Sequence, residues 1–131
     1  MIARRRWFPV LGLVAVLVGA GCSDPVSPFQ PELSNKTDTF EFQATGVSGV
    51  TSTYTYSWAN TGSRASINHS TTTTAGSATL VIRDAAGTVV YNKALVPSLN
   101  EPTLNGVAGT WTIQLGLTGY SGTMNFRAQK L

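Results

Sequence analysis

From Asp38 to the end of the chain, apolar and polar residues alternate with a period of two, which is typical of half-buried β-strands. Residues that favour turns separate the alternating runs, and no run in this part has helical periodicity. The pattern therefore predicts about seven strands. The alternating positions of these runs are Phe40, Phe42 and Ala44; Tyr54, Tyr56 and Trp58; Ala65, Ile67 and His69; Ala78, Leu80 and Ile82; Val89 and Tyr91; Trp111, Ile113, Leu115 and Leu117; and Met124, Phe126 and Ala128. Tyr91 and Tyr120 lie near predicted loops and are freer to be exposed.

The segments between these runs are rich in glycine, asparagine, aspartate and proline, which favour turns. Residues 84–87, Asp-Ala-Ala-Gly, form the clearest hairpin signal, because aspartate starts a type I turn and glycine accepts a positive φ. Short antiparallel strands in about 94 residues predict an all-β fold. We expect a single antiparallel two-sheet β-sandwich of immunoglobulin-like or jelly-roll type. The other predicted turns are residues 46–49, 60–62, 97–109 and 118–122.

The first 21 residues have a different pattern. Arg4, Arg5 and Arg6 are followed by fifteen uncharged residues, 7–21. A positive start, an apolar run and small residues at its end are the parts of a signal peptide. A membrane-spanning helix needs about 20 apolar residues, so this shorter run predicts a cleaved signal peptide rather than a permanent anchor.

The apolar run ends in Gly19, Ala20 and Gly21, directly before Cys22, the only cysteine of the chain. This arrangement resembles the lipobox of bacterial lipoproteins, in which a branched residue usually occupies the place of Gly19. The resemblance implies cleavage before Cys22 and lipid attached to that residue. Ser23 after the cysteine implies sorting to the outer membrane of a Gram-negative cell. The alternative is an ordinary secretory signal that is cleaved near Gly21 and leaves a free thiol.

A proline-rich stretch follows the cysteine. Pro25, Pro28 and Pro31 recur every third residue among polar neighbours, a composition that favours an extended, flexible linker. Phe29 and Leu33 are apolar exceptions that could fold back on the domain. The predicted organisation is a signal peptide at 1–21, a lipidated cysteine and linker at 22–37, and a β-sandwich domain at 38–131.

The basic charge of the chain comes from its first residues. The sequence has nine Lys and Arg against six Asp and Glu, and three of the nine are Arg4, Arg5 and Arg6. The mature protein is therefore formally neutral, without the basic character expected of a nucleic-acid-binding protein. A single cysteine also leaves no internal disulfide, so the core alone must hold the fold.

Two segments near the C-terminus are similar to a known type of domain. Residues 109–115, Gly-Thr-Trp-Thr-Ile-Gln-Leu, and 120–126, Tyr-Ser-Gly-Thr-Met-Asn-Phe, resemble the closing hairpin of secreted bacterial β-sandwich domains of the pre-peptidase C-terminal type. With the turn at 84–87, the resemblance covers roughly the last 50 residues. It implies an accessory module of exported proteins. Some of these modules bind calcium, but this chain has no acidic cluster suited to that ion.

Catalytic residues are not evident. His69 is the only histidine, and it is in phase with apolar positions, which predicts a structural role. The carboxylates of Asp38, Glu41, Asp84 and Glu101 lie on separate predicted elements, and no serine lies in a Gly-x-Ser-x-Gly motif. We therefore predict neither an enzyme nor a metal or cofactor site. A cleft in which His69 meets a carboxylate would instead favour a small enzyme.

Tyr54, Tyr56 and Trp58 are the candidate ligand-binding residues. Three aromatic rings on one strand face could form a platform for sugar rings or polymer chains. The alternative is that this face is the core, which is favoured because the opposite face of the strand is wholly polar. A core position of these rings favours an interaction or structural module, whereas an exposed platform favours a ligand-binding module.

The sequence thus predicts a non-enzymatic, lipid-anchored cell-envelope protein with a tethered interaction or structural module. The alternative function is a module that binds carbohydrate or a small ligand through exposed aromatics. The expected partners are the membrane, through lipid on Cys22, and an envelope protein or a second copy, through an unprotected strand edge. No nucleic-acid partner is expected.

Overall fold

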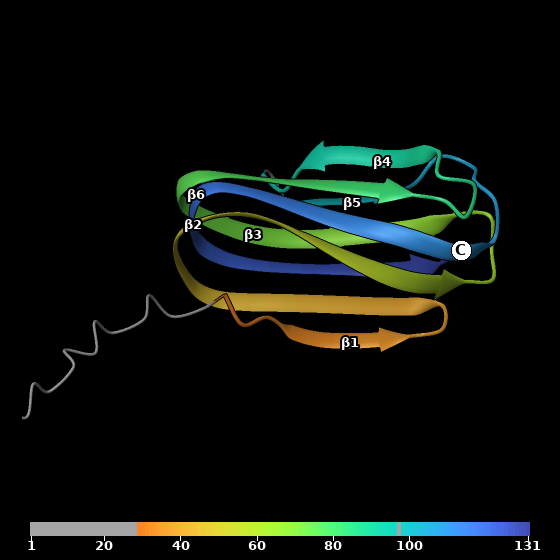
Figure 1. Cartoon of the computed structure of the whole chain (residues 1–131), viewed down its shortest axis with the longest axis horizontal. Helices are drawn as coiled ribbons and strands as arrows, with labels where there is room; N and C mark the ends of the chain where they lie inside the picture. Colours follow the sequence, from red (N-terminus) through yellow and green to blue (C-terminus); the bar gives the residue numbers. More distant parts are fainter. Residues whose placement is uncertain (1–28, 97) are drawn as a thin grey trace, which may run out of the picture.

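The computed structural model describes residues 29–96 and 98–131. Within them the chain forms six strands and no helix, joined in one antiparallel sheet (Figure 1). The all-β prediction is confirmed. The predicted signal peptide and Cys22 lie outside the described residues. The strands are β1 (Glu32–Lys36), β2 (Thr39–Asn60), β3 (Ala65–Arg83), β4 (Val89–Ala94), β5 (Leu99–Pro102) and β6 (Gly109–Lys130).

The three long strands β2, β3 and β6 bend in the middle, so the sheet folds back on itself (Figure 1). The first half of β2 pairs with the second half of β6, from Thr39↔Gln129 to Ala44↔Met124. After register shifts, the second half of β2 pairs with the first half of β6. β3 pairs along the other side of β6 in the same way.

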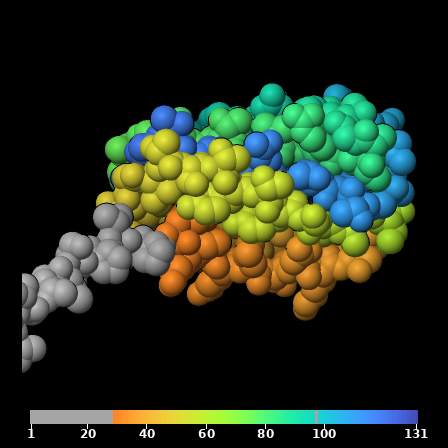
Figure 2. Space-filling model, in the orientation of Figure 1, coloured from red at the N-terminus to blue at the C-terminus, as the bar shows by residue number. Residues whose placement is uncertain are grey.

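The folded sheet therefore has two arms. We call the first arm the part that contains β1, the first halves of β2 and β3, the second half of β6, and β5. The second arm contains the other halves of the three long strands and β4. In Figure 2 the orange residues of β1 and early β2 form one border of the molecular surface. The short strands β1, β4 and β5 are thus edges of the folded sheet.

The structure corrects the predicted strand boundaries. Six of the predicted short strands are halves of β2, β3 and β6. The glycine-rich segments 46–49 and 118–122 bend β2 and β6 without ending them, and β3 bends at its register shifts between Thr73 and Ser77. Gly46 and Gly49 have positive φ values of 63° and 59°, as expected of a bulged, strongly bent strand. β1 and β5 lie in predicted linker and loop, so the sheet begins at Glu32 rather than at Asp38.

The core lies between the two arms and contains most of the alternating apolar positions. Tyr91 and Tyr120 were expected to be freer to be exposed, but both are buried in it. Trp58 and Trp111, neighbours in the register of β2 and β6, meet edge to face with ring centroids 5.9 Å apart. Phe42 and Phe126 stack at 4.9 Å in the first arm. The period-two alternation therefore identified the buried face correctly along every long strand, apart from the bends.

The predicted hairpin at 84–87 is confirmed, and its aspartate is structural. The carbonyl oxygen of Asp84 accepts the Gly87 N–H at 3.0 Å. Its carboxylate accepts the N–H groups of Ala86 and Thr88 at 3.0 and 2.8 Å, and that of Val107 at 2.9 Å. These backbone donors, that of Val107 foremost, hold the pKa of Asp84 below its usual value. Asp84 thereby fastens the β3–β4 turn to the loop before β6.

Candidate functional site

The aromatic ladder of β2 faces the core side of the second arm. Trp58 is buried, and its indole N–H donates to the Lys36 carbonyl at 3.1 Å. Tyr54 and Tyr56 are half-buried. Phe29, just before β1, stacks on Tyr54 with ring centroids 4.4 Å apart. The three predicted ligand-binding rings therefore line the space between the arms and do not form an exposed platform.

A buried polar cluster lies on the other side of the molecule, where β3, β4 and β5 meet. His69 is 1% exposed, and its Nε2 atom lies 3.4 Å from the hydroxyl of Tyr91. Glu101 is brought beside them by β5, which pairs with β3 in the register Ile67↔Glu101. The carboxylate of Glu101 forms an ion pair with Lys93 at 3.5 Å.

The sequence did not connect these residues. His69 was expected in a structural or rim position, Tyr91 near a loop and freer to be exposed, and Glu101 in a loop. The structure buries His69 and Tyr91 and places Glu101 in β5. Only the pairing of the four-residue strand β5 with β3 brings the carboxylate to the histidine. A strand this short leaves too little alternation to be recognised in a sequence.

The environment shifts the proton affinities of the cluster. Burial lowers the pKa of His69, and the nearby charge of Glu101 opposes part of that shift. Burial also raises the pKa of Tyr91, and the nearby carboxylate of Glu101 reinforces this shift. Burial therefore favours the neutral forms of the imidazole and of the phenol.

An open cavity of about 400 Å³ adjoins the cluster between β4 and β5. Tyr91 and Glu101 line it, whereas His69, which is 1% exposed, does not. Within the described residues no three His, Cys, Asp or Glu side chains are grouped to hold a metal ion. The Tyr91 phenol and the ion pair of Glu101 with Lys93 thus lie beside this cavity. The remaining lining residues are Val89, Val90, Asn92, Lys93, Pro102 and Leu104.

The cluster predicts a pH-dependent stability. Unfolded His69 takes up a proton near its ordinary pKa of 6.5, whereas the folded protein resists protonation until lower pH. The free energy of unfolding should therefore fall as the pH drops from 6.5 to the lowered pKa. Asp38 and Asp84 have pKa values lowered from 3.8. Their protonation therefore lowers the free energy of unfolding only in more acidic solution. Urea unfolding of the wild type and of His69→Gln at several pH values tests this, and identical pH profiles would contradict it.

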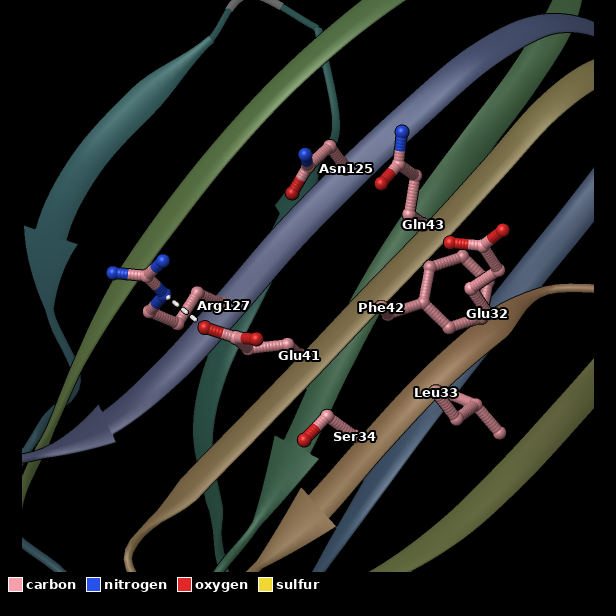
Figure 3. Close-up of a pocket in the computed structure, with 8 residues that line it drawn as sticks. All are labelled: Glu32, Leu33, Ser34, Glu41, Phe42, Gln43, Asn125 and Arg127. Carbon is pink, nitrogen blue, oxygen red and sulfur yellow. Dashed lines mark ion pairs between the residues drawn. The ribbon is translucent and has the colours of Figure 1, made fainter.

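A second cavity, of about 410 Å³, lies on the outer face of the first arm (Figure 3). Arg127 of β6 and Glu41 of β2 form an ion pair across its floor at 2.9 Å. Gln43 and Asn125 lie beside this pair, and the residues of β1 form its rim. This polar surface is continuous with the free side of β1. The β1 residues that line it are Glu32, Leu33 and Ser34.

Comparison of the chain with models of protein families, with curated proteins and with solved structures finds no match in any of the three. The resemblances to bacterial lipoproteins and to pre-peptidase C-terminal domains stay predictions from the residues. Among residues 29–96 and 98–131, no helix is long and apolar enough to cross a membrane.

Proposed function

We propose that the protein is a non-enzymatic, lipid-anchored protein of the bacterial cell envelope, whose β-domain is an interaction or structural module. The observation that carries the proposal is the order of residues at the N-terminus: three arginines, fifteen uncharged residues, and small residues directly before Cys22. Lipid on Cys22 would hold the protein on a membrane. Ser23 supports the outer membrane as its destination.

We further infer that the folded sheet acts as a two-layer β-sandwich, with one arm as each layer. Side chains from both arms share a core, as in the contact of Phe40 with Tyr56, whose ring centroids are 5.6 Å apart. Phe29 contacts this domain, so the proposed linker between Cys22 and the domain is residues 23–28 rather than 23–37. Six residues reach roughly 20 Å at most when fully extended. A tether of this length would keep the domain close to the membrane surface.

The position of the aromatic ladder weighs against the alternative function. A platform for sugar rings needs exposed ring faces, whereas Trp58 is 1% exposed and Phe29 stacks on Tyr54. Pairing of an exposed strand edge with another protein remains the better-supported mode of interaction, because β1, β4 and β5 each have one side without a partner strand among the described residues.

Lipid anchoring predicts the mass and the location of the mature protein. Expressed in a Gram-negative host, the wild type should lack residues 1–21, carry the added mass of acyl chains and fractionate with membranes. Cys22→Ala should lose both the acyl mass and the membrane association, because the thiol that accepts the lipid is gone. Intact-mass spectrometry and membrane fractionation measure both properties.

The control moves the cysteine rather than removing it. Cys22→Ala/Ser27→Cys retains one cysteine but takes it away from the small residues at the end of the apolar run. It should behave like Cys22→Ala. A wild-type protein that is soluble, unacylated and cleaved elsewhere would refute the anchor and favour a secreted module with a free thiol.

A further inference from the structure

β1 is the outermost strand of the first arm and lies at the border of the molecule (Figure 1). Its five residues pair with β2 on one side only, from Glu32↔Gln43 to Lys36↔Thr39. None of the described residues pairs with its other side. Four of the five residues are exposed, and Ser34 is half-buried. β1 is therefore an accessible edge at which the sheet can be extended.

The backbone groups on the free side of β1 follow from the turn that joins it to β2. Lys36 and Thr39 flank a two-residue turn and pair with each other, so the backbone groups of Lys36 point toward β2. Backbone direction alternates along a strand, so Ser34 and Glu32 also point toward β2. The N–H and C=O groups of Leu33 and Asn35 then point outward. These two residues are placed symmetrically about Ser34.

The charges of β1 are symmetric about the same residue. Glu32 and Lys36 lie two residues before and two residues after Ser34. Neither charged group has an ion pair or a side-chain hydrogen bond within the described part of the chain, whereas every other charged side chain there has a polar partner. Those partners are Lys93 for Glu101, Arg127 for Glu41, Lys130 for Asp38, the carbonyls of Thr103 and Gly87 for Arg64 and Arg83, and three backbone N–H groups for Asp84.

We propose that β1 pairs with β1 of a second copy, antiparallel and about a two-fold axis at Ser34. This deepens the proposed function, on which it rests, by naming the partner and the edge. Leu33 of one copy lies opposite Asn35 of the other, and their outward backbone groups form four hydrogen bonds across the axis. Glu32 of each copy lies opposite Lys36 of the other. The same register thus satisfies the free backbone groups and both unpaired charges.

The apolar side of the edge fits the same register. Leu33 is 46% exposed, although its place in β1 is on the core side of the strand, opposite Phe42. About the axis at Ser34, the two copies of Leu33 are diagonal neighbours on one face, a separation that long side chains can bridge. The paired arms would form one sheet, and the polar outer surfaces of Figure 3 would become continuous across it.

The other edges lack this self-complementarity. β4 carries Lys93, which is already paired with Glu101. β5 has four residues and ends in Pro102, which cannot donate to a ladder. Two backbone carbonyls on the free side of the second half of β2 already have donors. The Ser57 carbonyl accepts a hydrogen bond from the side-chain amide of Asn35 at 2.8 Å, and the Ala59 carbonyl accepts one from the Asp38 N–H at 2.8 Å.

A five-residue ladder is a small interface, so pairing should be weak in dilute solution and strong among anchored copies. Attachment to one membrane raises the effective concentration of neighbouring domains, which converts weak contacts into stable ones. The expected assembly is therefore a dimer that forms readily on the membrane. Detergent-extracted protein should dimerise only as its concentration rises.

Charge exchange tests the register. Glu32→Lys places lysine opposite lysine, and Lys36→Glu places glutamate opposite glutamate, so each variant alone should dimerise about tenfold or more weakly than the wild type. An equimolar mixture of the two variants should recover dimerisation, because each lysine then faces a glutamate. The double variant Glu32→Lys/Lys36→Glu should recover it as well. Light scattering of the full detergent-extracted chain over a concentration series measures this, with Asn92→Lys on the β4 edge as the matched control.

Cross-linking tests the axis on the membrane. Cα atoms that face each other at a non-hydrogen-bonded pair lie about 4.5 Å apart, within reach of a disulfide. Ser34→Cys should therefore give a dimer on oxidation of membranes with diamide, beyond any background from Cys22 in the wild type. Asn92→Cys should not.

Two results would overturn the proposal: dimers of the wild type that Glu32→Lys leaves intact, or the absence of both dimers and the Ser34→Cys cross-link. The first would mean that another edge or another kind of contact joins the copies. The second would leave a foreign protein as the partner. Neither result affects the anchor, which intact mass and fractionation test separately.

Discussion

Trp111→Ala should destabilise the protein by about 3–5 kcal/mol, the usual range when a large aromatic side chain is removed from a core. Trp111 is fully buried, and its ring meets Trp58 edge to face at 85°. Its indole N–H donates to the Val107 carbonyl at 2.8 Å, so the substitution also removes a hydrogen bond. Small domains are stable by only about 5–15 kcal/mol. This one change should therefore bring the fold close to unfolding.

Urea unfolding followed by circular dichroism measures the effect without relying on tryptophan fluorescence. Trp111→Phe is the matched variant, because it keeps a ring in the core and removes only the indole hydrogen bond and part of the volume. It should cost about 1–2 kcal/mol. Thr112→Ala, on the other face of β6, should change stability by less than about 0.5 kcal/mol. A loss below about 1 kcal/mol for Trp111→Ala would mean that the core collapses around the missing ring.

The sequence predicted the buried face better than it predicted the strands. The phase of the alternation places Phe40, Trp58 and Phe126 inward whatever the ends of their strands, because the period is a local property of extended backbone. The bends could not be predicted in this way. Gly46 and Gly49 look like a turn between two strands, whereas pairing with β6 continues on both sides of them. Whether a glycine pair ends a strand or bends it depends on the neighbouring strand.

The short edge strands were missed for a related reason. β1 contains only five residues and directly follows a proline-rich stretch. The proline-rich composition predicted a linker there instead of a strand. β1 is held by its turn to β2, where Asp38 adopts a positive φ of 67° and its carboxylate accepts the Thr61 N–H at 2.7 Å. These contacts join residues 23 positions apart, which no local pattern contains. The cluster of His69, Tyr91 and Glu101 depends on β5 in the same way.

Gly122→Ala should destabilise the protein by about 3 kcal/mol, because two costs add at this position. Gly122 lies at the bend of β6 with a φ of +144°, a conformation that residues with a side chain rarely adopt. A Cβ atom there would also overlap the carbonyl oxygen of Thr72 and come within 3.0 Å of the Tyr120 hydroxyl. Thr72 belongs to the bend of β3, so a side chain at Gly122 would push apart two strands that must turn together.

Gly46→Ala separates the two costs. Gly46 has a φ of +63°, but a Cβ atom there would meet no other atom within 4 Å. This substitution should therefore cost only the strain of the left-handed conformation, about 1 kcal/mol. Equal losses for the two variants in urea unfolding would show that the β3 and β6 bends can move apart freely. A larger loss at Gly122 would show that close backbone contact between the bends keeps the two arms folded over one core.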